Sequence, residues 1–204
     1  MSKYDGALHL RGEVTPLMKL FLQRRSCRRY AEGSATEAQV EAVLGAARRF
    51  QERMGFTAPR IAIVDGARMR EVVKAALAGV IGKINPWLPF TRAQHLILCG
   101  ALCPADQAGR DRAIKEAAMT MQVLLLAATE LGLATCWMAG INHERVESAS
   151  PLEGGGELIA ISPLGLPPAK RGISWDNLLY HVASKRRKPL ADLWMSERWG
   201  KEDR

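Results

Sequence analysis

The chain has 204 residues, 48% of them hydrophobic, and a formal net charge of +8 at pH 7. This length and apolar content are typical of one domain with a full hydrophobic core, so we expect a single domain over residues 1–204. The basic balance favours phosphate-bearing partners, but the lysines and arginines form short separate groups and no nucleic-acid-reading motif is present, which argues against a nucleic-acid-binding protein.

Two helices are expected before the first strand. Thr15 and Pro16 begin the first helix, because threonine is a good N-cap and proline is tolerated at the first helical position. Thr36 followed by Gln39 forms the pattern of a capping box. The apolar spacing after it predicts a second helix that ends at about Phe50.

Short β-branched or apolar runs predict strands over residues 60–65, 95–100, 134–139 and 157–161. Helices are expected over residues 67–78 and 111–131, and the second of these is so apolar beyond Met119 that it should be central and buried. Glycine- and proline-rich stretches predict loops over residues 79–91, 104–109 and 142–156. The alternation of helices and strands predicts an α+β domain or a three-layer α/β domain.

None of the four cysteines forms a Cys-x-x-Cys pair, which indicates reduced thiols in a cytoplasmic protein. The N-terminus lacks an apolar signal core and no apolar run reaches transmembrane length, so no membrane association is expected. A metal site built from Cys99, Cys103 and a histidine is disfavoured, because no matching second ligand pair is present. The histidines are scattered and are interpreted as structural or surface residues: His9, His95, His143 and His181.

The stretch Arg24-Arg25-Ser26-Cys27-Arg28-Arg29-Tyr30 places four guanidinium groups and a hydroxyl within seven residues. Like charges this close repel one another, and a bound anion would offset the repulsion, because arginine offers forked donors that match phosphate. The alternative is a solvated basic turn after the first helix. We refer to residues 24–30 as the arginine cluster.

Three separated stretches, taken in order, resemble the nitroreductase family of FMN-dependent oxidoreductases. The first is the arginine cluster. The second is the buried helix that ends in Leu131-Gly132 and leads to Cys136-Trp137, and the third is Arg187-Lys188-Pro189-Leu190. The chain resembles a short branch of the family, because the family's Asn-x-Gln-Pro-Trp segment has no counterpart in residues 49–60, where only Pro59 keeps the pattern.

The resemblance implies a mixed central sheet flanked by helices, assembled as a homodimer with FMN in a groove between the subunits. The residues that match FMN-binding positions are Arg24, Arg25, Ser26, Arg28, Met138, Ala139, Gly140, Lys185 and Arg187. Arg24, Ser26 and Arg28 match positions that contact the phosphate, the ribityl chain and the pyrimidine edge of the flavin, and Arg25 contributes through its backbone or side chain. The backbone of residues 138–140 would lie near flavin N5, and the C-terminal basic residues would close on the phosphate.

The resemblance also implies an enzyme that passes electrons from NAD(P)H through bound FMN to an oxidised small molecule, such as a nitroaromatic or a quinone, in a ping-pong cycle. No catalytic triad or pair of carboxylates stands out in the sequence, in keeping with a cofactor that supplies the redox chemistry. The alternatives are a flavin-dependent dehydrogenase or dehalogenase on the same fold, and a non-catalytic flavin-binding sensor. For Trp137, core packing is at least as well supported as flavin contact.

Overall fold

The computed structural model describes residues 15–79, 92–150, 152 and 156–169. Its helices are α1 (Pro16–Gln23), α2 (Glu37–Met54), α3 (Gly66–Ala76), α5 (Gln107–Glu130) and α6 (His143–Ala149). Its strands are β1 (Pro59–Asp65), β2 (His95–Ala101), β3 (Ala134–Thr135) and β4 (Glu157–Gly165). These elements lie within one compact unit, Met1–Pro168. A single domain over residues 1–204 stays a prediction, because residues 170–204 lie outside the described part.

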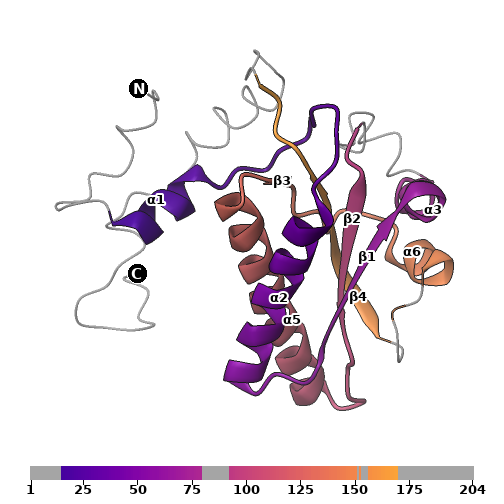
Figure 1. Cartoon of the computed structure of the whole chain (residues 1–204). Coiled ribbons are helices and arrows are strands. Elements are labelled where there is room, and N and C mark those ends of the chain that lie inside the picture. The colour runs from indigo at the N-terminus through magenta and orange to yellow at the C-terminus, as the bar shows by residue number, and fades with distance from the viewer. Residues whose placement is uncertain (1–14, 80–91, 151, 153–155, 170–204) are drawn as a thin grey trace, which may run out of the picture. The chain divides into compact units, whose positions relative to one another are not determined.

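The sheet has the strand order β1-β2-β4-β3, with helices on both of its faces (Figure 1). Helices α2 and α5 pack together on one face, while α3 and α6 pack together on the other. This arrangement confirms the predicted α+β fold with three layers. The ladders among the described strands are all antiparallel, and the parallel component of the expected mixed sheet is a single bridge between Ser26 and Thr135.

Strand β2 lies at the centre of the core because its side chains are buried on both faces of the sheet. Ile97 and Cys99 belong to the hydrophobic cluster under α2 and α5. Leu96 and Leu98 belong to the cluster under α3 and α6. The alternation follows from the two-residue period of a strand, and a continuous apolar run is what a strand covered on both faces requires.

The helix starts predicted from capping residues are confirmed. The Thr15 hydroxyl accepts the Met18 N–H at 3.3 Å. The Thr36 hydroxyl accepts the Gln39 N–H at 3.2 Å, and the Gln39 side chain accepts the Thr36 N–H at 3.0 Å, which completes the capping box. Helix α2 runs four residues past the expected end to Met54, and Gly55 ends it with a φ of 69°, a left-handed conformation that glycine adopts without strain.

Three expectations about secondary structure are wrong. The loop expected over residues 104–109 ends at Asp106, whose side chain caps α5 by accepting the Gly109 N–H at 2.8 Å. The strand expected over residues 134–139 ends at Thr135, because the Cys136 N–H is taken by the Ser162 hydroxyl at 3.1 Å instead of a strand partner. The loop expected over residues 142–156 contains α6, whose first turn is capped by the Asn142 side chain accepting the Arg145 N–H at 3.1 Å. The run Gly154-Gly155-Gly156 is typical of a loop, and the prediction extended that loop over the residues that form α6.

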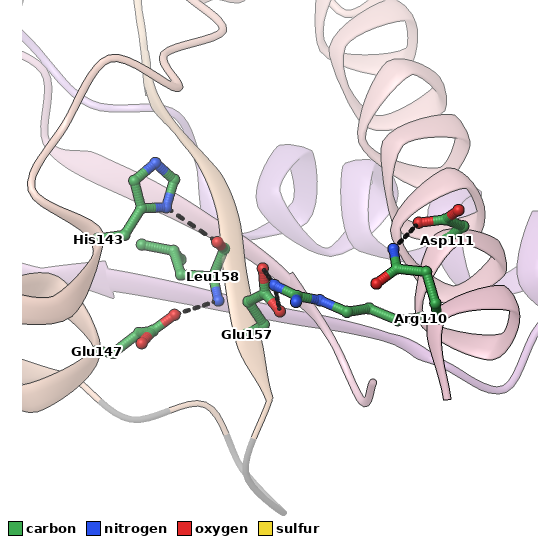
Figure 2. Close-up of polar contacts among 7 residues, drawn as sticks. Arg110, Asp111, His143, Glu147, Glu157 and Leu158 are labelled. Atoms are coloured by element: carbon green, nitrogen blue, oxygen red, sulfur yellow. Dashed lines mark hydrogen bonds and ion pairs between the residues drawn. The ribbon is translucent and has the colours of Figure 1, made fainter. Parts of the chain in front are cut away.

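An ion pair joins the start of α5 to the start of β4. Nη2 of Arg110 lies 2.7 Å from a carboxylate oxygen of Glu157 (Figure 2). The hydrogen bond from Arg110 lowers the pKa of Glu157, and burial opposes it in part. Both side chains are partly exposed, so water screens the pair and its contribution is small.

Glu157→Gln is expected to lower the melting temperature by about 1–2 °C at neutral pH. Because the folded-state pKa of Glu157 lies below its unfolded value, the pair stabilises the fold above the unfolded pKa and loses this contribution as pH falls through the folded value. Thermal unfolding of both proteins at neutral and acidic pH measures the difference. A gap that persists or grows in acid would contradict the assignment.

Candidate functional site

The arginine cluster is part of the sheet edge. Ser26 forms a parallel bridge with Thr135, and the Cys27 N–H donates to the Thr135 carbonyl at 2.8 Å. Further along, the Ala31 N–H donates to the Leu166 carbonyl at 2.9 Å. The segment that leaves α1 is thus bonded beside β3, the outer strand of the sheet (Figure 1). These backbone bonds argue against the alternative interpretation of the arginine cluster as a freely solvated turn.

Tyr30 anchors the cluster from its C-terminal end. Its side chain is buried, and its hydroxyl donates to the Cys27 carbonyl at 2.7 Å. Burial raises the pKa of Tyr30, the nearby Cys136 and Cys27 raise it further, and Arg28 opposes them, so the hydroxyl remains a donor at neutral pH. The ring also packs on Gly165, where an added Cβ would lie 3.0 Å from Tyr30 Cδ1. Tyr30 therefore fixes the backbone from which the arginines extend.

The arginines differ in burial. Arg29 is exposed, while Arg24, Arg25 and Arg28 are half-buried and Ser26 is exposed. Two buried side-chain atoms among the described residues have no hydrogen-bond partner, Nη1 of Arg24 and Oγ1 of Thr135. Burying a guanidinium N–H without an acceptor costs free energy. The arginine cluster therefore presents an unsatisfied cationic donor next to its bridge with β3, and an anion is the partner that would satisfy it.

The second predicted segment returns to the same edge. Met138 lies three residues after Thr135 and forms a bridge with Ile161 of β4, with both its N–H and its carbonyl bonded at 2.9 Å. Ala139 and Gly140 then leave the sheet and are exposed. No backbone acceptor within the described residues takes the Gly140 N–H. The fold thus brings the arginine cluster and residues 138–140 to one edge of the sheet, as a shared binding site requires.

The remaining predicted residues have other positions. Lys185 and Arg187 lie outside the described residues. Trp137 is half-buried and packs against the hydrophobic cluster under α2 and α5, which favours the core-packing interpretation.

Two residues at this edge were not singled out from the sequence. Thr135 is buried and bridges Ser26, but a threonine in a strand carries no signal of that role. His143 begins α6 and bonds two backbone carbonyls, those of Leu158 (Figure 2) and Ala139. The structural interpretation of His143 holds, but the missed helix concealed which groups it contacts.

The described residues were also compared with the requirements of a metal site, a reactive thiol and a membrane-spanning helix. No group of three or more histidine, cysteine or acidic side chains there could hold a metal ion. Burial raises the pKa of Cys99 to about 12, so its thiol is protonated and unreactive at neutral pH. Among the helices that the structure describes, none is long and apolar enough to cross a membrane.

Comparison with known proteins places the chain in a family. The sequence model of the nitroreductase family matches residues 21–166, which include the arginine cluster and residues 138–140. The chain belongs to the nitroreductase family. Membership of this family indicates that the protein is an oxidoreductase. No curated protein matches this chain in sequence.

Solved structures of nitroreductases share the fold. The FMN-dependent nitroreductase NfnB from Mycobacterium smegmatis, in complex with NADPH, has a TM-score of 0.67 and 16% identity, covering 89% of this chain and 98% of that one. A nitroreductase-like protein from Bacillus cereus has a TM-score of 0.66 and 18% identity, with coverages of 91% and 97%. A nitroreductase from Desulfovibrio desulfuricans, in complex with FMN, has a TM-score of 0.60 and 22% identity, with coverages of 91% and 99%.

Proposed function

We propose that this nitroreductase-family chain binds FMN at the β3 edge and passes electrons from NAD(P)H to an oxidised small molecule, such as a nitroaromatic or a quinone. The observation that carries the proposal is the buried Nη1 of Arg24, which has no hydrogen-bond partner and lies in the segment that bridges β3. Its position agrees with the FMN-binding position that the family resemblance implies. The FMN and NADPH complexes of the structural relatives support the choice of cofactor and electron donor.

The donor set of the described residues fits an FMN phosphate. Arg24, Arg25 and Arg28 would offset its negative charge by charge-assisted hydrogen bonds, and the exposed Ser26 hydroxyl is a further donor. Lys185 and Arg187, outside the described residues, would add to this charge. The Gly140 N–H, which has no backbone acceptor among the described residues, would donate to the flavin ring.

Bound FMN would supply the redox chemistry, accepting electrons from NAD(P)H and releasing them to the acceptor in a ping-pong cycle. The protein's part would be to bind and orient the cofactor with arginine side chains and backbone donors. This division explains why the proposal needs no catalytic acid or base among the described side chains. We further propose that the protein acts in the cytoplasm, since no disulfide joins the described cysteines.

The proposed enzyme is a homodimer. Helix α1 buries none of its residues in the described structure, and Leu17 and Phe21 are 58% and 51% exposed. Further large apolar side chains are exposed on α1, on α5 and at the C-cap of α5: Leu22, Met119 and Leu131. Helices α1 and α5 are in contact, so these side chains offer apolar surface on neighbouring elements. Exposed apolar surface of this kind is typical of a protein interface, and a two-fold dimer is the commonest assembly.

Purified protein, or protein incubated with FMN and desalted, is expected to be yellow, and NADH or NADPH should bleach its flavin absorbance under anaerobic conditions. Addition of a quinone or nitroaromatic should then restore the colour. A colourless protein that takes up no added FMN would refute the proposal. A yellow protein that neither nicotinamide reduces would instead favour a dehydrogenase, a dehalogenase or a flavin-binding sensor.

A further inference from the structure

His143 bonds two backbone carbonyls at once. Its Nδ1 lies 2.9 Å from the Leu158 carbonyl oxygen, and its Nε2 lies 2.8 Å from the Ala139 carbonyl oxygen (Figure 2 shows the first contact). A carbonyl oxygen can only accept, so each ring nitrogen must donate. Neutral imidazole has a single N–H, and the imidazolium has two. Both hydrogen bonds therefore form together only when the ring carries an extra proton.

The contact to Leu158 belongs to a larger docking of α6 on β4. The Leu158 N–H donates to the Glu147 carboxylate at 2.6 Å, while its carbonyl accepts from His143 (Figure 2). His143 and Glu147 stand four residues apart and so share one face of α6. On its outer side, β4 is paired with β3 and then with Met138, which bridges Ile161. The chain leaves the sheet after Met138, so the backbone groups of Leu158 need other hydrogen-bond partners. Two side chains of α6 thus bond the edge that β3 does not reach.

The contact to Ala139 reaches into the candidate site. The Ala139 carbonyl also accepts the Ile141 N–H at 2.9 Å, so two donors fix its direction. No described peptide bond is cis. In a planar trans peptide the carbonyl and the following N–H point in opposite directions. Holding the Ala139 carbonyl toward α6 therefore aims the Gly140 N–H away from α6, where no described backbone group accepts it.

We propose that His143 is a positioning residue of the candidate site. Its ring ties the Ala139 carbonyl to β4, as a peptide clamp, and so aims the Gly140 N–H toward the bound cofactor. The orientation of the peptide is independent of any ligand, whereas its effect on FMN rests on the proposed function.

The first test follows the Gly140 amide in protein labelled with 15N-glycine, with its resonance assigned from a Gly140→Ala spectrum. The Gly140 resonance is expected to lie at a different position in His143→Gln than in wild type, because the Ala139 carbonyl loses the side-chain contact that fixes its direction. Glu147→Ala is the matched control, because it weakens the docking of α6 on β4 without contacting Ala139. The control should leave the Gly140 resonance where it lies in wild type.

The second test measures FMN dissociation constants by flavin fluorescence. His143→Gln is expected to weaken FMN binding about 5-fold, the value of one misdirected hydrogen bond, and Glu147→Ala should change it by less than about 2-fold. Equal effects of the two variants on the Gly140 amide and on FMN would overturn the proposal and leave His143 as a docking residue alone. If wild-type protein binds no FMN while the Gly140 resonance still moves in His143→Gln and not in Glu147→Ala, the peptide clamp stands and the proposed cofactor falls.

Discussion

Arg24→Ala is expected to weaken FMN binding about 10- to 100-fold, while the FMN-free protein becomes no less stable than wild type. The first effect follows from the loss of a charge-assisted hydrogen bond to the phosphate. The second follows because Nη1 of Arg24 is buried without a partner, so its removal relieves a desolvation cost and breaks no bond made by that atom.

Fluorescence titration with FMN and thermal unfolding, with and without FMN, together measure both effects. Wild type should gain thermal stability at saturating FMN, and the variant should gain less at the same concentration. Arg29→Ala is the control within the cluster, because Arg29 is exposed and matches no FMN-binding position. Arg28→Ala should weaken FMN binding more than Arg29→Ala does. Equal losses for all three variants would show that the cluster acts as diffuse charge, and the assignment of individual residues would be wrong.

Gly100→Ala is expected to lower the free energy of unfolding by about 3 kcal/mol and the melting temperature by about 6–12 °C. Gly100 is buried in β2 at the register shift between β2 and β4. An added Cβ would collide with Leu152 Cδ1 and would lie 2.5 Å from the Glu157 carbonyl oxygen. The second clash is with a backbone atom, so it cannot be relieved by turning a side chain. The start of β4 at Glu157 would have to move away from β2.

Gly45→Ala is the matched control for this substitution. Gly45 lies within α2, and the nearest atoms to an added Cβ are the Arg49 guanidinium nitrogens at 3.9 Å. Alanine is the better helix former, so Gly45→Ala should stabilise the protein by about 0.5–1 kcal/mol. Chemical denaturation of the two variants gives both values. If Gly100→Ala raised the free energy of unfolding as Gly45→Ala is expected to do, backbone preference and not the lack of space at Gly100 would determine the outcome.

The elements predicted well from the sequence are those whose signals are local. The capping box at Thr36 and the N-cap at Thr15 both formed as expected, since each needs only residues within one turn of the helix. The elements predicted poorly depend on distant partners. Residues 136–139 are apolar enough for a strand, yet the Ser162 hydroxyl takes the Cys136 N–H and ends the ladder. Helix α6 has a local cap at Asn142, which the glycine-rich stretch after it obscured, and its side-chain contacts with β4 cannot be read from spacing along the chain.

The candidate site divides in a similar way. The arginine cluster, the Leu131-Gly132 turn and the segment 138–140 could be recognised from the sequence as parts of a nitroreductase pattern, and the family match bears out that recognition. Their adjacency could not be read from spacing, because it depends on the parallel bridge between Ser26 and Thr135, more than a hundred residues apart. The contacts of His143 with two carbonyls likewise arise only when α6, β4 and residue 139 meet.

The sequence by itself therefore determined the family, the fold class and the chemical character of the arginine cluster, because composition, caps and motifs are properties of neighbouring residues. The tertiary structure decided which of these residues meet, which arginine donor is left without an acceptor, and which backbone N–H is free of a strand partner. Those are questions of burial and hydrogen-bond satisfaction. Their answers depend on segments far apart in the chain, which come together only at the edge of the folded sheet.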